Sequence, residues 1–203
     1  MNNYEYIVAC LPVLRPEDSR SDSLDAAAIV EEIREQLSAG DAAVLDTLLA
    51  GYDPDRMDAG FYTEALRHKN RFIREWFAFD MELRNATVAY LNQSLGRPAG
   101  QDRILLEGRE DEEFEDLPAV ESVLRGSDIL RRERGLDDLR WRKIEELTMM
   151  DYFDLDAILG FVARLKIIDR WLQLDPDSGR AFFRRLVDDI QSTYENKKQT
   201  IAI

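Results

Sequence analysis

The sequence is short of the residues that most enzyme chemistry uses. Its 203 residues include one cysteine, Cys10, and one histidine, His68. A Ser-His-Asp or Cys-His site needs an imidazole beside its nucleophile, but His68 stands between Arg67 and Lys69, and neighbouring cations lower its basicity. One Cys and one His cannot build a tetrahedral zinc site, and a di-iron bundle needs two Glu-x-x-His pairs. We therefore expect no catalytic residue, no metal and no cofactor.

Phosphate-binding and calcium-binding loops are missing as well. The chain contains neither Gly-x-x-x-x-Gly-Lys nor Gly-x-Gly-x-x-Gly, the glycine-rich loops that hold nucleotide phosphates. Residues 175–179 begin like a calcium loop, but Leu186 stands where such a loop needs its bidentate glutamate. We interpret this segment as a turn that caps a helix.

Positive charge is scarce. The chain has 27 Lys and Arg against 41 Asp and Glu, and its net charge is −14. Nucleic-acid binding and attachment to anionic lipid both depend on basic surface, so we expect neither. The hydrophobic share of 45% is ordinary for a globular chain, and it predicts a folded core rather than disorder.

Long hydrophobic runs are absent, and this predicts a chain that does not span a membrane. The opening residues carry no positive n-region, so we expect no signal peptide. A single cysteine fits a reducing compartment, and the expected location is the cytoplasm. Cys10 stands among Val8, Ala9 and Leu11, which predicts a buried and inert thiol.

What the sequence does contain is helical periodicity, with only 10 glycines and no useful run of β-alternation. The predicted fold class is all-α, a helical bundle around one long central helix over residues 58–95. Apolar residues form two stripes along this segment, one including Phe72 and Trp76 and the other Ile73 and Phe77. A helix that is apolar on two faces needs packing partners on both sides.

Other helices are predicted on both sides of this segment. Residues 4–11 fit a short strand or a helical turn equally well. The remaining predicted helices cover residues 24–37 with a stop at Gly40, 41–49 with Asp41 as cap, a helix opened by Pro118, one from a Ser127 cap to a stop at Gly135, 136–150, 155–174 capped by Asp154, and a last helix from Pro176.

Residues 97–116 form the clearest break in the helical pattern. Seven carboxylates lie within residues 107–116, where Arg109 is the one basic residue. We expect one helical domain over residues 1–203, with halves 1–96 and 117–203 joined by this acidic linker. The linker is either a solvated loop or a docking site for a basic partner. The candidate partner-binding residues in it are Glu112, Glu113, Glu115 and Asp116.

A second candidate for partner binding is basic. Arg67, Arg71 and Arg74 repeat at helical spacing, and the alternative is that they pair within the chain, because acidic residues are interleaved with them. Four polar residues interrupt the aromatic-rich segment and are expected to be buried with hydrogen-bond partners: Asn70, Arg74, Arg84 and Asn85.

Several segments resemble a bacterial family of unknown biochemical activity that is encoded beside V/A-type ATP synthase subunits. The resemblance lies in residues 4–14, 71–77, 84–86, 90–91 and 95–97. The chain is similar in character to a shortened form of the ATPase's all-helical funnel, the component that links the rotating central stalk to the membrane rotor ring. In that wider family an Asp, an Asn and an Arg-rich amphipathic helix recur, and Asp80 with Asn85 is a loose match.

The resemblance implies a non-enzymatic subunit or accessory factor of a V/A-type ATPase. It would bind the central stalk and rotor ring, and it would reach the membrane periphery only through that complex. The alternative is a generic cytoplasmic helical adaptor or regulatory protein. An enzyme that uses carboxylates and a divalent metal is a third hypothesis, although no ligand pattern supports it.

Overall fold

The computed structural model describes residues 4–16, 24–109 and 113–174. In these residues the chain forms eight α-helices and one short 3₁₀ helix, with no strand, which confirms the all-α prediction. The helices are α1 (Glu5–Cys10), α2 (Ala26–Gln36), α3 (Ala39–Ala50), α4 (Ala59–Leu66), α5 (Arg71–Ser94), α6 (Leu117–Leu124), α7 (Ile129–Thr148) and α8 (Leu155–Leu172); the 3₁₀ helix η2 (Pro54–Arg56) follows α3.

The chain divides into two compact units. Residues 1–14 and 25–167 form the first, and residues 15–24 and 168–203 form the second. Every residue of the candidate site described below belongs to the first unit. The predicted division into halves 1–96 and 117–203 stays a prediction. The predicted helix from Pro176 lies outside the described residues.

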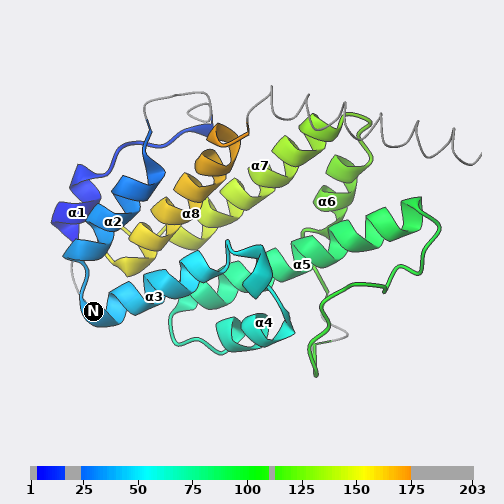
Figure 1. The fold of residues 1–203 in the computed structure, drawn as a ribbon, viewed down its shortest axis with the longest axis horizontal. Helices are drawn as coiled ribbons and strands as arrows, with labels where there is room; N and C mark the ends of the chain where they lie inside the picture. Colours follow the sequence, from blue (N-terminus) through cyan, green and yellow to red (C-terminus); the bar gives the residue numbers. More distant parts are fainter. Residues whose placement is uncertain (1–3, 17–23, 110–112, 175–203) are drawn as a thin grey trace, which may run out of the picture. The chain divides into compact units, whose positions relative to one another are not determined.

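Helix α5 is the centre of the first unit, as the two apolar stripes predict. Helices α3, α4, α6 and α7 all contact it, and Figure 1 shows α4 on one side of α5 with α6 and α7 on the other. The side chains of Phe72, Ile73 and Phe77 are almost completely buried between these partners. With 24 residues, α5 is about 36 Å long at 1.5 Å per residue.

The predicted single helix over residues 58–95 is wrong, because the chain breaks before Asn70. The Asn70 side chain accepts a hydrogen bond from the Ile73 amide at 2.9 Å and so caps a new helix, α5. The Arg74 guanidinium donates to the carbonyls of His68 and Lys69, at 2.7 and 2.8 Å, and holds the turn. Asn70 therefore starts a helix, where we expected it inside one.

The break lets α4 fold back against α5. The Phe61 ring meets the Phe77 ring edge to face, with ring centroids 4.9 Å apart, and Tyr62 lies against the same ring at 6.4 Å. The two aromatic stripes of the sequence are therefore the facing surfaces of two helices. Helical periodicity continues across the turn, which is why it did not show in the pattern.

Two predicted glycine stops are also wrong. Gly40 lies in the first turn of α3, which is capped by Ser38 instead of Asp41. Gly135 lies inside α7, where a Cβ atom would come within 2.7 Å of the Val123 side chain on α6. Glycine at this position permits the close approach of two helices rather than ending one.

The other predicted caps fare better. Asp154 accepts from the Ala157 amide at 3.1 Å and Pro118 lies in the first turn of α6, as predicted. The cap expected at Ser127 is its neighbour Asp128, which accepts from the Arg131 amide at 3.0 Å.

Residues 4–11 form helix α1 and not a strand. The Tyr4 amide donates to the Phe153 carbonyl at 2.7 Å, and this bond ties the start of α1 to the turn before α8. Cys10 is exposed, so the prediction of a buried thiol is wrong: a single helical turn leaves Cys10 on its outer side. Within the described residues, no helix is both long and apolar enough to cross a membrane.

Candidate partner-binding site

After α5 the chain turns back and runs along the helix that it has just left, as Figure 1 shows. Two buried asparagines fasten this return segment, residues 97–109, to α5. The Asn85 side chain donates to the Ile104 carbonyl and accepts from the Ile104 amide, both at 2.8 Å. Asn92 donates to the Gln101 carbonyl at 2.6 Å. The return segment is therefore held by side-chain amides rather than by an apolar core.

Of the four polar residues expected to be buried, only Asn85 is, with 3% of its surface exposed. Asn70 and Arg74 are half-buried at the turn, and the Arg84 side chain is 42% exposed. Asn92 was missed, although it lies two helical turns after Asn85 and therefore on the same face of α5. That spacing was the signal available in the sequence.

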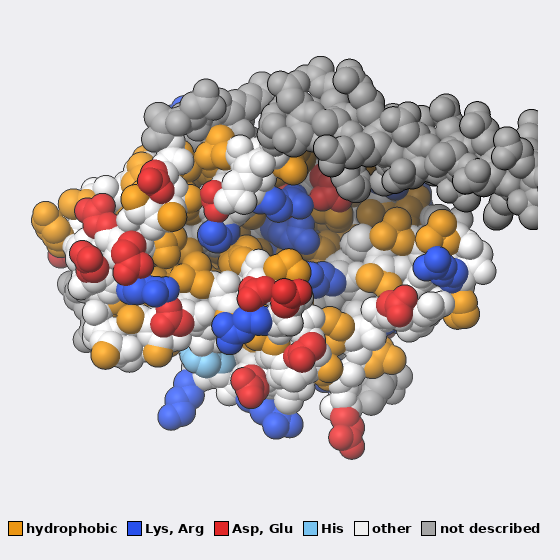
Figure 2. Space-filling model, viewed as in Figure 1, with side chains coloured by type: hydrophobic (Ala, Val, Ile, Leu, Met, Phe, Trp, Pro, Cys, Tyr) orange, Lys and Arg blue, Asp and Glu red, His pale blue; other side chains and the backbone are white. Residues whose placement is uncertain are grey.

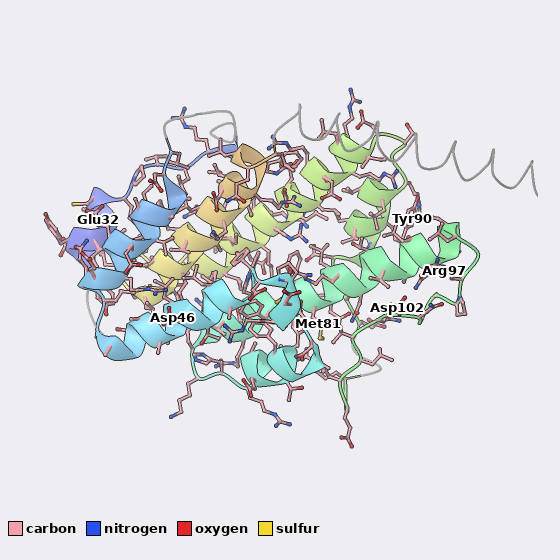
Figure 3. All side chains as sticks on the ribbon, in the orientation of Figure 1. Glu32, Asp46, Met81, Tyr90, Arg97 and Asp102 are labelled. Atoms are coloured by element: carbon pink, nitrogen blue, oxygen red, sulfur yellow. The ribbon has the colours of Figure 1, made fainter. Side chains whose placement is uncertain are left out.

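A groove lies between the C-terminal half of α5, the return segment and the start of α6. Its volume is about 680 Å³. Helix α5 contributes a stripe of mostly small side chains, while Tyr90 and Phe114 supply aromatic walls. Figure 3 shows Tyr90 near the end of α5, with Arg97 and Asp102 on the return segment beside it. The lining residues are Glu82, Asn85, Ala86, Ala89, Tyr90, Gln93, Ala99, Arg103, Glu113, Phe114, Glu115, Leu117, Pro118 and Glu121.

A smaller hollow of about 300 Å³ adjoins the groove, toward the N-terminal half of α5. Both hollows are lined by Glu82, Glu113, Phe114 and Glu115. The Phe114 ring is half-buried and packs against the Phe79 ring, with centroids 5.9 Å apart. Phe114 therefore anchors the acidic segment to the core and forms a wall shared by both hollows.

The rim of the groove is acidic. Its lining includes four glutamates against one arginine, Arg103. Glu121 forms an ion pair with Arg125 at 2.8 Å. Glu113 and Glu115 are exposed, and neither forms an ion pair within the part of the chain that the structure describes. These two carboxylates are consequently available to a cation on a partner.

The predicted acidic residues take different positions. Glu113 and Glu115 line both hollows, while Asp116 lines the smaller one and pairs with Arg142 of α7 at 2.6 Å. Glu112 lies outside the described residues. The acidic run is therefore neither wholly solvated nor wholly free, because Phe114 and Asp116 attach it to the helices.

The structure does not bring the three predicted arginines together as one binding surface. Arg71 donates to the carboxylate of Asp151 at 2.5 Å and to the Leu147 carbonyl at 2.9 Å, and so joins α5 to the turn before α8. Arg74 holds the α4–α5 turn, and Arg67 is an exposed residue at the end of α4. Pairing within the chain, the alternative left open by the sequence, describes Arg71. Figure 2 shows the same interleaving of acidic and basic side chains over most of one face.

A buried charge cluster lies on the other side of α5. The Asp80 carboxylate accepts from the Tyr62 hydroxyl and from the Arg84 guanidinium, both at 2.7 Å. Arg140 of α7 lies 3.9 Å from Asp80 and donates to Asp137 at 3.0 Å. Two carboxylates thus face two guanidinium groups, a balanced arrangement that joins α4, α5 and α7.

Two tyrosines beside this cluster have raised pKa values. Burial is the largest cause of the raised pKa of both Tyr52 and Tyr62, and the negative charge of Asp80 raises both further. The Tyr52 hydroxyl is buried and has no hydrogen-bond partner among the described residues. Both side chains stay neutral at ordinary pH, so the cluster serves packing rather than acid-base chemistry.

His68 and the metal question are quickly described. Partial burial lowers the pKa of His68, with Arg74 acting in the same direction, and the His68 Nδ1 atom accepts from the Asn70 amide at 3.1 Å. His68 is therefore neutral at pH 7 and part of the α4–α5 turn. In residues 4–16, 24–109 and 113–174, no three His, Cys, Asp or Glu side chains are placed to hold a metal ion.

Comparison with known proteins links part of this chain to a family. A family model described as a protein of unknown function, DUF2764, matches residues 110–194. Within the described residues this match covers α6, α7, α8 and the acidic wall of the groove, but not α5. No curated protein and no solved structure matches the chain.

Proposed function

We propose that this protein is a non-enzymatic docking subunit that holds a partner in the groove along α5. The observation that carries the proposal is the groove itself, about 680 Å³ in volume with aromatic walls and four glutamates in its lining. Its other ionisable groups are Arg103 and the Tyr90 hydroxyl. Such a combination of apolar walls and an acidic rim suits the binding of a basic surface.

The assembly that we propose is a V/A-type ATPase, with the central stalk and rotor ring as partners. This part rests on the resemblance of residues 4–14 and 71–97 to proteins encoded beside that enzyme. An all-helical chain is the expected material for such a linker, because helix faces dock against other helices. A helical adaptor or regulator of another complex would use the same groove.

The test is affinity purification of the chain at its native level, followed by mass spectrometry. We expect the catalytic, stalk and rotor subunits of the ATPase to co-purify. The double variant E113K/E115K should reduce their recovery at least fivefold, because it reverses two rim charges. Recovery should fall further as salt is raised, since exposed charges are screened within about 8 Å at physiological ionic strength.

A matched control variant is E32K/E35K. Glu32 and Glu35 are exposed on α2, which contributes no residue to either hollow, and the change in net charge is the same. Equal loss of partners from both variants would show a non-specific charge effect and contradict the groove as the docking site. A purification without ATPase subunits would reject the assignment to that complex.

A further inference from the structure

The stripe that α5 presents to the groove has the spacing of a helix-packing seam. Glu82, Ala86, Ala89 and Gln93 lie four, three and four residues apart, and all four line the groove. This is the spacing at which one helix packs lengthwise against another at a small crossing angle. The stripe extends for about 16 Å at 1.5 Å per residue, which is about three turns.

The two alanines at the middle of this seam let a second backbone come close. Helices that approach closely carry small residues at the contact, whereas a face meant for solvent has no need of them. The opposite wall is aromatic and apolar, with Phe114, Leu117 and Pro118. Phe114 is fixed by the Phe79 ring, so this wall is present before any partner arrives.

The charges of the groove indicate what the second helix carries. Glu82 lies at one end of the seam, and Glu113 and Glu115 stand on the opposite wall. Asp116 is already paired with Arg142, and Glu121 with Arg125. An occupant that places Lys or Arg at both flanks of a narrow apolar stripe would meet Glu113 and Glu115, whereas an acidic occupant would be repelled.

We propose that the occupant of the groove is an amphipathic helix of a partner protein, with a narrow stripe of small apolar residues between flanks of Lys and Arg. The inference rests on the proposed docking function and names the chemistry of the docked segment. A compact organic cation is the main alternative, because an acidic site with two aromatic walls also attracts ammonium groups. The length of the seam favours a helix, since it extends well beyond the reach of one small ligand.

The probe is a synthetic 18-residue peptide of alanine, leucine and lysine. Ala and Leu occupy positions at 4-3-4 spacing, and lysines flank them. Three other probes complete the set: a scrambled copy in which the apolar stripe is lost, a copy with glutamate in place of lysine, and spermine. Binding is measured by titration of the full-length ¹⁵N-labelled protein, and the peptide's helix content is followed by circular dichroism.

We expect saturable binding of the amphipathic peptide, with shifts at residues 82–93 and 113–118 and a gain of peptide helicity. The scrambled and glutamate copies should bind at least tenfold more weakly. E113K/E115K should weaken binding at least fivefold. Ala89→Arg should weaken it by tenfold or more, because it places bulk and a positive charge in the seam. The control E32K/E35K should bind like the unchanged protein.

Three outcomes overturn the inference. They are no saturable binding up to millimolar peptide, equal binding of the scrambled copy, and spermine binding to the same residues at least as tightly. The proposed function fails separately. A native complex that depends on Glu113 and Glu115, with no binding of the helical peptide, would leave docking intact and make the helical occupant wrong. Peptide binding without any native ATPase complex would preserve the occupant and reject the assembly.

Discussion

The two halves of α5 are built on opposite plans. The half from Arg71 to Leu83 buries eight side chains, including Phe72, Trp76 and Phe77. In the half from Arg84 to Ser94 the only buried side chains are Asn85 and Asn92. One half is therefore held by apolar packing against α3, α4 and α7, and the other is held to its return segment by amide hydrogen bonds.

The contrast teaches where the protein keeps its stability and where it exposes a surface for binding. A fully buried aromatic side chain contributes several kcal/mol, whereas a typical net hydrogen bond contributes about 1 kcal/mol. The second half of α5 can therefore carry small residues and an open groove without weakening the fold. A set of substitutions can test this division, from the largest expected effect to the smallest.

The largest effect is expected from Phe77→Ala. The Phe77 ring is 1% exposed and touches the rings of Phe61 and Tyr62. Its truncation leaves a cavity, and we expect a loss of about 3–5 kcal/mol in the free energy of unfolding, measured by urea denaturation.

The matched change in the other half is Tyr90→Ala. Tyr90 lies on the groove and is only half-buried, so we expect a loss of less than about 1 kcal/mol. Similar losses in the two variants would remove the distinction between the halves of α5.

A middle effect is expected from Asn85→Ala. The change removes both hydrogen bonds to Ile104 and leaves its amide and carbonyl without these partners. We expect a loss of about 1–3 kcal/mol, together with faster hydrogen exchange of the Ile104 amide. The exposed neighbour Gln93, changed to alanine, serves as control. Unchanged exchange at Ile104 would mean that something other than Asn85 holds the return segment.

The smallest effect concerns alkaline pH. Burial raises the pKa of Tyr62 far above its usual value of about 10, so the folded protein keeps a proton that the unfolded chain releases. This contribution is complete below about pH 10 and is lost as the pH rises further. Near pH 11 it should lower the free energy of unfolding by about 1 kcal/mol relative to pH 10.

The variant Tyr62→Phe isolates this contribution. It should be less stable than the unchanged protein at pH 8, because Asp80 loses one hydrogen bond, but it should lose less stability between pH 10 and 11. Unfolding curves at pH 8, 10 and 11 provide the comparison. Identical alkaline slopes for the two proteins would place Tyr62 outside the titrating set.

Much of the first half of α5 could be predicted from the sequence, because burial of aromatic side chains leaves a periodic pattern. The same pattern concealed the turn at Asn70, since an asparagine within apolar periodicity fits a buried polar position as well as a helix cap. Gly135 misled for a related reason. A glycine that makes room for Val123 and a glycine that ends a helix look alike in one sequence.

The candidate site was predicted only in part. The acidic run drew attention to Glu113 and Glu115, which do line the groove. The aromatic wall at Phe114 and the fastening of the return segment by Asn92 depend on the path of the chain after α5. Contacts between residues that only the tertiary fold brings together leave no periodic signal, so charge alone was visible.

The return segment also makes the groove a part of the protein that can change its size. Asn85 and Asn92 hold this segment at residues 104 and 101, and the chain between Ile104 and Phe114 contributes few buried side chains of its own. Residues inserted there would reshape one wall of the groove while the aromatic core on the first half of α5 stayed as it is. Variation in loop length at this place would let related chains accept different partners on one unchanged framework.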